Sequence, residues 1–339
     1  MEKKRRNLLN RKENIVGVVL RTNKEAKMNL GYACINMQLS YPQKYGGQPK
    51  GVGRITTGRK MIKRTFEAKG TDLASELILK NVKDLDKIVD WNIMNGYKLF
   101  RISSTMIPRK TEYDWSDLKD LEEIKQWLRS AGTKANTHGL RLTTHPGQFN
   151  VLTSPHEHVV QNCINDLTIH GEVFDMMGLS RTPYNKINIH AGGVYGEKEN
   201  AIERFVQNFK RLPESVQTRL TVENDDKETC YSTQELYDYV YKRIGIPIVF
   251  DYHHHRFCPG DLTERAAVEL AASTWPEGIT PCFHYSESRS EEKNDPKIRP
   301  QAHSDYVYQK IDTYGYDLDI VVEAKHKELA VEKYLELHG

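Results

Sequence analysis

Short apolar segments alternate with amphipathic stretches along this chain, and this alternation restricts its fold more than any other feature. The apolar segments are rich in Ile, Val, Leu and Thr, as buried parallel strands are. They lie at residues 28–36, 97–103, 140–145, 185–193, 219–224, 246–252, 281–288 and 319–325. Helices are predicted between and after them, at 71–95, 117–138, 156–178, 197–212, 233–244, 262–274, 305–314 and 327–337. Eight strands alternating with eight helices predict a single (β/α)8 TIM barrel.

A doubly wound open sheet is the alternative fold for alternating strands and helices. The nucleotide-binding forms of that fold carry a Gly-rich phosphate fingerprint, and neither GxGxxG nor GxxxxGK[ST] occurs in this chain. We therefore expect a barrel and no nucleotide cofactor. The sequence has no run of about 18 apolar residues, so no membrane span is expected.

The cysteines and the N-terminus bear on the compartment. The chain has five cysteines, an odd number, and no CxxC pair. A disulfide framework or a structural zinc knuckle is therefore not expected. The N-terminus is basic but has no long apolar core, so it is not predicted to be a secretory signal. These features indicate an intracellular protein, either cytoplasmic or nuclear.

Basic residues concentrate in two segments, although the net charge of the chain is only +3. Residues 1–12 hold six basic groups and one acid, and residues 41–70 hold eight basic groups and one acid. The second segment is Gly-rich and is either a solvated loop or an arm that neutralises phosphates. The predicted organisation is a basic extension over 1–27 and one barrel domain over 28–339, with 41–70 as an inserted loop.

Polar side chains occupy the carboxyl-terminal ends of the predicted strands, where barrel enzymes hold their active sites. In strand order they are Tyr32, Asn36, Arg101, Ser103, His145, His190, Glu223, Asp251, His284 and Glu323. Alternate residues of a strand share a face, so Asn188 and His190 point the same way, as do Thr221 and Glu223. We expect these groups to meet in the barrel mouth. A single strand-end histidine would more often be a capping or hydrogen-bonded residue.

A ring of buried carboxylates and histidines needs cations, because an unpaired buried carboxylate is costly. Imidazole together with bridging carboxylate suits Zn²⁺ or Mn²⁺, and the set is larger than one ion requires. We therefore expect two or three ions. Such a cluster suits phosphodiester hydrolysis, in which one ion lowers the pKa of a bound water and the others stabilise the leaving oxygen.

The stretch VFDYHHH (249–255) places three histidines directly after a strand-end aspartate and its neighbouring tyrosine. Asp251 is expected to be a ligand, and at least one of the histidines to turn back to the same cluster. Strand parity favours His253, but strands often end at such a point. His253, His254 and His255 therefore remain alternatives on the residues alone.

Nine segments in order carry a family resemblance. They are LGYACIN, FRISS, LTTHPGQFNVLTSP, INIHAGG, LTVEND, VFDYHHH, FHYSES, AHSDYV and VVEAKHKE, between about residues 28 and 330. Together they resemble the UV damage endonucleases, metal-dependent DNA-repair enzymes related to endonuclease IV and to xylose isomerase-like barrels. The resemblance implies a barrel that nicks DNA immediately 5′ of ultraviolet photoproducts (cyclobutane dimers and 6-4 photoproducts), leaving 3′-hydroxyl and 5′-phosphate ends.

The same resemblance implies a set of metal ligands. They are His145, His190 and Glu223 for one ion, Glu223 with Asp251, His284 and Glu323 for a second, and His254 with His303 for a third. Among the three adjacent histidines the resemblance thus selects His254. Mn²⁺ is the favoured ion, with Zn²⁺ or Mg²⁺ as alternatives. Glu223, His190 and Asp251 are expected to carry the catalysis.

Lesion recognition is also implied by the resemblance. Gln148 and Phe149 of HPGQF match a probe pair that enters the duplex at the lesion, and such wedges fill an unstacked step. The alternative for Phe149 is a core aromatic residue. Tyr32 and Asn36 match residues of the first strand that line the lesion side.

The chain departs from the family pattern at three positions. Some members carry Tyr where this chain has Phe149. Phenylalanine keeps the aromatic face for stacking but lacks the hydroxyl group of tyrosine. Thr105 stands where others carry an ionisable residue, and Cys282 beside His284 is unusual. These departures bear on lesion preference and metal chemistry more than on the reaction.

Three other functions compete with this interpretation: a metal-dependent sugar isomerase or epimerase, an abasic-site endonuclease of the endonuclease IV type, and a metal-dependent DNA-binding protein without catalysis. The first would not need the HPGQF loop or a basic arm, and the second would differ in substrate choice alone. The expected partner is damaged double-stranded DNA, with no membrane, and the protein is expected to be a monomer.

Overall fold

The computed structural model describes residues 26–339, so the basic segment 1–12 and nearly all of the predicted extension 1–27 lie outside the described residues. Eight parallel strands form one sheet in the order β6-β5-β4-β3-β2-β1-β8-β7. They are β1 Met28–Ala33, β2 Leu99–Ile102, β3 Arg141–Thr144, β4 Ile187–His190, β5 Leu220–Glu223, β6 Ile248–Val249, β7 Cys282–Tyr285 and β8 Leu318–Val322. Each coincides with a predicted strand to within a few residues, which confirms the pattern.

The two edges of the sheet, β6 and β7, meet through a parallel bridge between Asp251 and His284. The backbone N–H of His284 donates to the carbonyl oxygen of Phe250 at 2.9 Å. The strands therefore form a nearly closed barrel, as the alternation predicts. All residues of β3, β5, β7 and β8 are buried, which is why these strands read as continuous runs and not as alternating ones.

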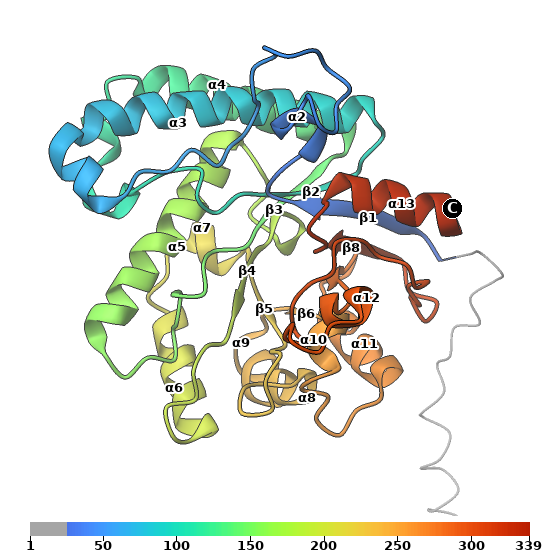
Figure 1. The fold of residues 1–339 in the computed structure, drawn as a ribbon. Coiled ribbons are helices and arrows are strands. Elements are labelled where there is room, and N and C mark those ends of the chain that lie inside the picture. The colour runs from blue at the N-terminus through green and yellow to red at the C-terminus, as the bar shows by residue number, and fades with distance from the viewer. Residues whose placement is uncertain (1–25) are drawn as a thin grey trace, which may run out of the picture.

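Helices surround the barrel (Figure 1). They are α2 Met37–Ser40, α3 Lys63–Met94, α4 Leu121–His138, α5 Glu157–Met177, α6 Lys198–Phe209, α7 Glu214–Gln217, α8 Thr233–Leu236, α9 Lys242–Ile244, α10 Tyr252–His255, α11 Glu264–Ala272, α12 Arg289–Lys293 and α13 Glu328–His338. The last helix, α13, lies beside β1 (Figure 1). Within residues 26–339, none of the helices combines the length and hydropathy needed to cross a bilayer.

The predicted helix at 305–314 is wrong, because this segment is irregular. Side-chain carboxylates take the backbone N–H groups that a helix would use. Both the Tyr308 and Gln309 N–H groups donate to Glu287 at 2.8 Å, and the Tyr306 N–H donates to Glu292 at 3.1 Å. These acceptors come from another part of the chain, so local periodicity did not reveal them.

The basic segment 41–70 is a loop only in part. It runs without regular structure from 41 to 62, and α3 begins at Lys63, earlier than the predicted start at residue 71. Gly70 interrupts this helix with φ 58° and ψ −155°, a conformation that glycine adopts without steric cost. The second part of α3, after Gly70, corresponds to the predicted helix 71–95.

Close packing inside the barrel depends on a glycine in the first strand. Gly31 pairs with Leu99 of β2, and a Cβ at Gly31 would lie 2.3 Å from the Leu99 carbonyl oxygen. At the amino-terminal end of the barrel, Arg141 and Asp319 form a buried ion pair at 2.8 Å. The candidate functional groups lie at the opposite end of the barrel, where the strands end.

Candidate metal centre at the barrel mouth

The centre of the barrel mouth is the carboxylate of Glu223, the last residue of β5. Its side chain is 1 % exposed. The Nε2 atom of His145 lies 3.0 Å from Glu223 Oε2, and Nδ1 of His284 lies 3.1 Å from Oε1. The Asn188 amide also donates to Oε2. The predicted convergence of residues from β3, β4, β5 and β7 is therefore present in the structure.

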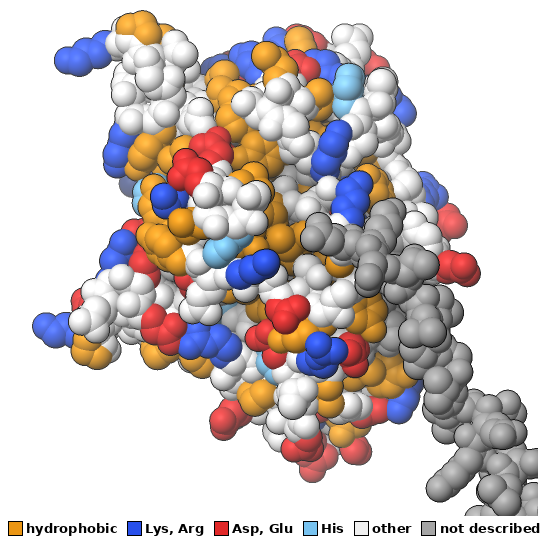
Figure 2. Space-filling view, turned by 90° about the vertical axis from the view of Figure 1, so that its right-hand side faces the viewer, with side chains coloured by type: hydrophobic (Ala, Val, Ile, Leu, Met, Phe, Trp, Pro, Cys, Tyr) orange, Lys and Arg blue, Asp and Glu red, His pale blue; other side chains and the backbone are white. Residues whose placement is uncertain are grey.

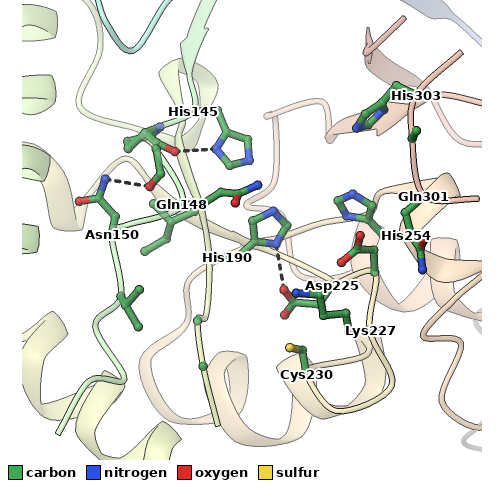
Figure 3. A pocket seen from close by; sticks show the side chains of 18 of the residues that line it. His145, Gln148, Asn150, His190, Asp225, Lys227, Cys230, His254, Gln301 and His303 are labelled. Carbon is green, nitrogen blue, oxygen red and sulfur yellow. Dashed lines mark hydrogen bonds and ion pairs between the residues drawn. The ribbon is translucent and has the colours of Figure 1, made fainter. Parts of the chain in front are cut away.

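His190 and His254 form a second group of possible ligands with Glu223. His190 is the residue of β4 that pairs in register with Glu223, and its Nδ1 lies 3.3 Å from Asp225 Oδ1. Nδ1 of His254 lies 3.5 Å from Glu223 Oε1. Figure 3 shows the rings of His145, His190 and His254 directed into one cavity of about 460 Å³. Asp225 was not predicted to be a site residue. The available signal was its position in VEND, two residues after Glu223, which would direct both side chains to the same face of an extended strand.

A second carboxylate, Glu323, lies just after β8. It forms an ion pair with Arg101 of β2, and its Oε1 lies 3.2 Å from Nδ1 of His284. Its Oε2 lies 3.8 Å from Nε2 of His303, whose Nδ1 contacts the Ser286 hydroxyl at 2.7 Å. His284 therefore lies between the two acids, and His303 closes the far side of the cavity.

Asp251 shows why strand parity failed in the histidine run. The residue is the N-cap of α10 and accepts the His254 backbone N–H at 2.9 Å. Because a helical turn begins at Tyr252, the third residue after Asp251 returns to the cluster, and this residue is His254. Parity would favour His253 in a continuing strand, but β6 ends at Val249, and His254 is the histidine of this run that comes close to Glu223. His253 is buried beside Phe257.

The charges around Glu223 suit a cation. Burial raises the pKa of Glu223, but His284 and His190 outweigh burial and hold it well below its usual range. Burial lowers the pKa of His284 to about 3 and that of His145 below its usual value. Burial, together with the charges of Glu223 and Glu323, raises the pKa of Asp251 to about 7. Burial disfavours the charged form of His190 and His254, but the negative charges around them outweigh burial: Glu223 and Asp225 raise the pKa of His190 to about 10, and Asp251 and Glu223 raise the pKa of His254. Because metal ligation requires neutral imidazole, a cation bound to these carboxylates would take the place of those protons.

The buried acceptor atoms point to the same conclusion. Asp251 Oδ2 is buried and has no hydrogen-bond partner among residues 26–339. Two triads bring ligand atoms within 4.8 Å of one another: His145, Glu223 and His284, and His190, Glu223 and His254. Nitrogen and carboxylate oxygen without thiolate match the donor preferences of Mn²⁺ and Zn²⁺. The residues present therefore fit divalent metal ions, and Glu223 belongs to both triads.

Comparison with known proteins agrees with this geometry. The profile of the UV-endonuclease UvdE family matches residues 28–338. This chain belongs to that family. Its curated relatives include a UV DNA damage endonuclease of Bacillus cereus, 34 % identical over 293 residues, a match that covers 82 % of this chain and 85 % of the relative. The UV-damage endonuclease of Schizosaccharomyces pombe is 35 % identical over 317 residues, or 89 % of this chain. The match spans 49 % of the fission yeast protein, about half of its length.

Solved structures support the fold of this UvdE-family chain. The crystal structure of SacUVDE matches with a TM-score of 0.75 and 26 % identity, over 91 % of this chain and 97 % of that one. A 3-keto-D-glucoside 4-epimerase from E. coli matches with a TM-score of 0.50 at 11 % identity, over 91 % of this chain and 97 % of that one. The second likeness shows the barrel fold alone.

In the HPGQF loop of this UvdE-family chain, Gln148 and Phe149, the predicted probe residues, line different cavities. The amide of Gln148 reaches into the cavity near His190 (Figure 3). The Phe149 side chain is 65 % exposed, so it is not a core aromatic residue. A Cβ at Gly147 would lie 2.5 Å from the Phe149 ring, which indicates that the ring packs over the glycine. Phe149 and Thr105 line a second cavity of about 610 Å³.

Tyr32 and Asn36 do not reach the surface of the mouth. Both are fully buried, and the Asn36 amide donates to the Tyr32 hydroxyl at 2.8 Å. The Asn36 carbonyl oxygen also accepts the Leu39 N–H at 2.8 Å and so caps α2. Their part in lesion recognition stays a prediction, and in this arrangement the two side chains hold β1 and α2 together.

One buried lysine near the centre was also not predicted from the sequence. Lys186 immediately precedes β4, is fully buried, and places Nζ 2.8 Å from Nε2 of His284. Burial lowers its pKa to about 8. A lysine inside the apolar run NKINIH was the available signal, since a lysine is seldom buried without a partner. Cys282, noted for its position beside His284, is a buried free cysteine at the start of β7.

Proposed function

We propose that this protein is a metal-dependent DNA-repair endonuclease that hydrolyses the phosphodiester bond immediately 5′ of UV photoproducts. The products would be a 3′-hydroxyl and a 5′-phosphate end, and the substrate damaged double-stranded DNA. The observation that carries the proposal is the buried Glu223 carboxylate, with nitrogen atoms of His145, His284 and His254 at 3.0 to 3.5 Å. Family membership supplies the substrate class, since the relatives are named UV-damage endonucleases.

The metal ligands are proposed as predicted. They are His145, His190 and Glu223 for one ion, Glu223, Asp251, His284 and Glu323 for a second, and His254 with His303 for a third. When bound, two or three divalent ions, with Mn²⁺ favoured, would supply a nucleophilic hydroxide near neutral pH and stabilise negative charge on phosphate. Glu223, His190 and Asp251 are the residues proposed to carry catalysis.

The chain's own side chains orient this set. Asp225 holds the His190 ring at 3.3 Å, and Arg101 pairs with Glu323. The exposed Phe149 side chain, which lines the second cavity, would enter an unstacked base step, and Gln148, whose amide reaches into the cavity of the candidate metal centre (Figure 3), would accompany it. A damaged step costs less to open, so this pair would favour lesions over intact DNA. The protein is proposed to act as a monomer without a nucleotide cofactor.

The test is a nicking assay with Mn²⁺ and an end-labelled duplex that bears one thymine dimer. Undamaged and abasic-site duplexes run alongside, each with and without EDTA. A metal-dependent nick directly 5′ of the dimer, absent from the undamaged duplex, is expected. Cutting at the abasic site alone would instead indicate an abasic-site endonuclease. No cutting of any duplex by metal-loaded protein would contradict the proposal and favour a sugar isomerase.

A further inference from the structure

Five aromatic rings from three separate segments form a continuous strip beside the barrel mouth. In order they are Tyr41, Tyr45, His326, Tyr306 and Tyr308. Successive ring centroids lie 6.2, 6.0, 4.6 and 6.4 Å apart. His326 and Tyr306 stack almost in parallel, with an interplanar angle of 8°. We call this set the aromatic strip; its members do not belong to the metal centre.

The middle of the aromatic strip, formed by His326 and Tyr306, lies close in the sequence to the proposed metal ligands. Tyr306 follows His303 by three residues, and His326 follows Glu323 by three. The two segments run side by side, because the Lys325 N–H donates to the Ser304 carbonyl at 2.9 Å and the His326 N–H donates to the Asp305 carbonyl at 3.1 Å. The middle of the strip is therefore built on the same two segments that carry His303 and Glu323.

The outer rings of the strip are exposed, with Tyr41 at 40 % and Tyr308 at 47 %. Cations accompany its first two rings. The Arg54 guanidinium lies 4.9 Å from the centre of the Tyr41 ring, and Lys44 Nζ lies 4.7 Å from that of Tyr45. Figure 2 shows Lys and Arg side chains spread over one face of the molecule, with many acids toward its lower end.

The loop 41–62 that carries Tyr41 and Tyr45 has five basic residues and no acid. Among the salt bridges of residues 26–339, only Arg59 of this loop has an acidic partner, Asp84 at 2.7 Å. On the other side of the strip, Asp305 is neutralised by Lys293 at 2.7 Å. The strip is thus bordered by cations whose charge the protein does not compensate.

A structural role explains only part of this arrangement. The half-buried rings of Tyr45, His326 and Tyr306 would serve to attach the loop to the segment after β8. That role does not account for exposed outer rings with cations over them. Exposed aromatic faces beside Lys and Arg are the usual means of binding unpaired nucleotides, since bases stack on the rings and cations attract the phosphates.

We propose that the aromatic strip binds unpaired nucleotides of the DNA strand next to the cleaved bond. The outer rings of Tyr41 and Tyr308 would stack with bases, and Arg54 and Lys44 would contact phosphates. This inference rests on the proposed function in that DNA is the substrate. A duplex opened at a lesion offers unpaired nucleotides, whereas an intact duplex keeps its bases stacked.

The test measures binding of lesion-free DNA, which the proposed reaction does not cleave. Fluorescence anisotropy would follow a labelled 15-nucleotide oligonucleotide, either single-stranded or annealed to its complement, with the full chain and Mn²⁺. Tyr41→Ala and Tyr308→Ala are expected to weaken single-strand binding about tenfold and duplex binding less than about twofold. Tyr41→Phe keeps a stacking face and should bind like the parent protein. Leu335→Ala, which truncates a 51 % exposed side chain on α13, is the matched control.

Equal losses on single strand and duplex would overturn the proposal, because they would indicate backbone contact without stacking. No loss in either alanine variant, or no detectable single-strand binding by the parent protein, would overturn it as well. The nicking assay is read separately. If the parent protein does not nick DNA but the two alanine variants bind single strands less tightly than the parent, the result would support nucleotide binding by the aromatic strip and contradict the proposed reaction.

Discussion

The imidazole of His284 is held from both sides, with Nδ1 3.1 Å from Glu223 Oε1 and Nε2 2.8 Å from Lys186 Nζ. The first contact belongs to the proposed metal centre, and the second lies in the buried barrel interior. When Nδ1 of His284 ligates a metal, Nε2 carries the proton and donates it, so the Lys186 amine accepts in its neutral form, which burial favours by lowering its pKa to about 8. Such a contact to the remote nitrogen of a ligand histidine fixes the ring orientation and influences metal affinity strongly.

Replacing Lys186 should therefore weaken metal binding without touching a ligand. Lys186→Met keeps the apolar stem and removes the contact with Nε2 of His284. We expect Mn²⁺ affinity to fall by about tenfold, measured by isothermal titration calorimetry. Lys333→Met, on the exposed part of α13, serves as the control. Unchanged affinity in Lys186→Met would show that His284 needs no second contact.

Glu223→Gln should abolish nicking and spare much of the DNA binding. The substitution keeps the shape of the side chain but removes the charge that three histidines surround. We expect the nicking rate to fall by about a thousandfold or more, because the proposed bridging ligand is lost. Glu336→Gln, on an exposed part of α13, is the matched control. Normal cutting by Glu223→Gln would disprove the bridging role.

Phe149→Ala should weaken damage discrimination while leaving metal content intact. The ring is 65 % exposed, so its removal leaves little cavity and should cost little stability. We expect the ratio of affinities for dimer-containing and undamaged duplex to fall by about tenfold, as loss of one stacking residue does. Affinity measurements on both duplexes, with metal analysis of the variant, check this. An unchanged ratio would mean that Phe149 does not probe the duplex.

Stability should depend on pH through Glu328 of α13. Its side chain is fully buried and accepts the Gln38 N–H at 2.7 Å, and burial raises its pKa from 4.5 to about 7. The folded state therefore binds this proton more tightly than the unfolded chain. Its stabilising contribution is complete below about pH 4.5 and is lost as the pH rises through about 7.

Glu328→Gln tests this dependence, because glutamine stays neutral. The variant should gain up to about 3 kcal/mol in unfolding free energy, relative to the parent, between pH 4.5 and pH 8. Urea unfolding of both proteins at the two pH values measures the difference, in which other titrating groups cancel. A difference that is the same at both values would contradict the raised pKa.

The basic segments should set the salt dependence of DNA binding. Lys50 and Lys60 of loop 41–62 have no acidic partner among the salt bridges of residues 26–339. Lys50→Gln with Lys60→Gln should reduce the slope of log affinity against log salt by up to about 2, if each contacts one phosphate. Removal of residues 1–12 is expected to act in the same direction. Binding titrations over a range of salt check both, and unchanged slopes would refute the prediction.

Much of the barrel could be predicted from the sequence, because parallel strands buried on both faces leave continuous apolar runs. The polar residues at the strand ends could also be predicted, because alternate residues share a face, as Asn188 does with His190 and Thr221 with Glu223. Convergence of these side chains follows from the closure of a barrel, in which all strands finish at one end. Family motifs then distinguished His254 from its neighbours, which periodicity did not.

Other features depend on contacts between distant parts of the chain. The segment 305–314 lost its predicted helix because Glu287 and Glu292 take its N–H groups. Lys186 and His284 are 98 residues apart, and only the closed barrel brings their side chains together. Local sequence determines which strands and helices form, because periodicity and capping act over a few residues. Which polar groups meet and which become buried depends on the three-dimensional packing of those elements, and that packing defined this site.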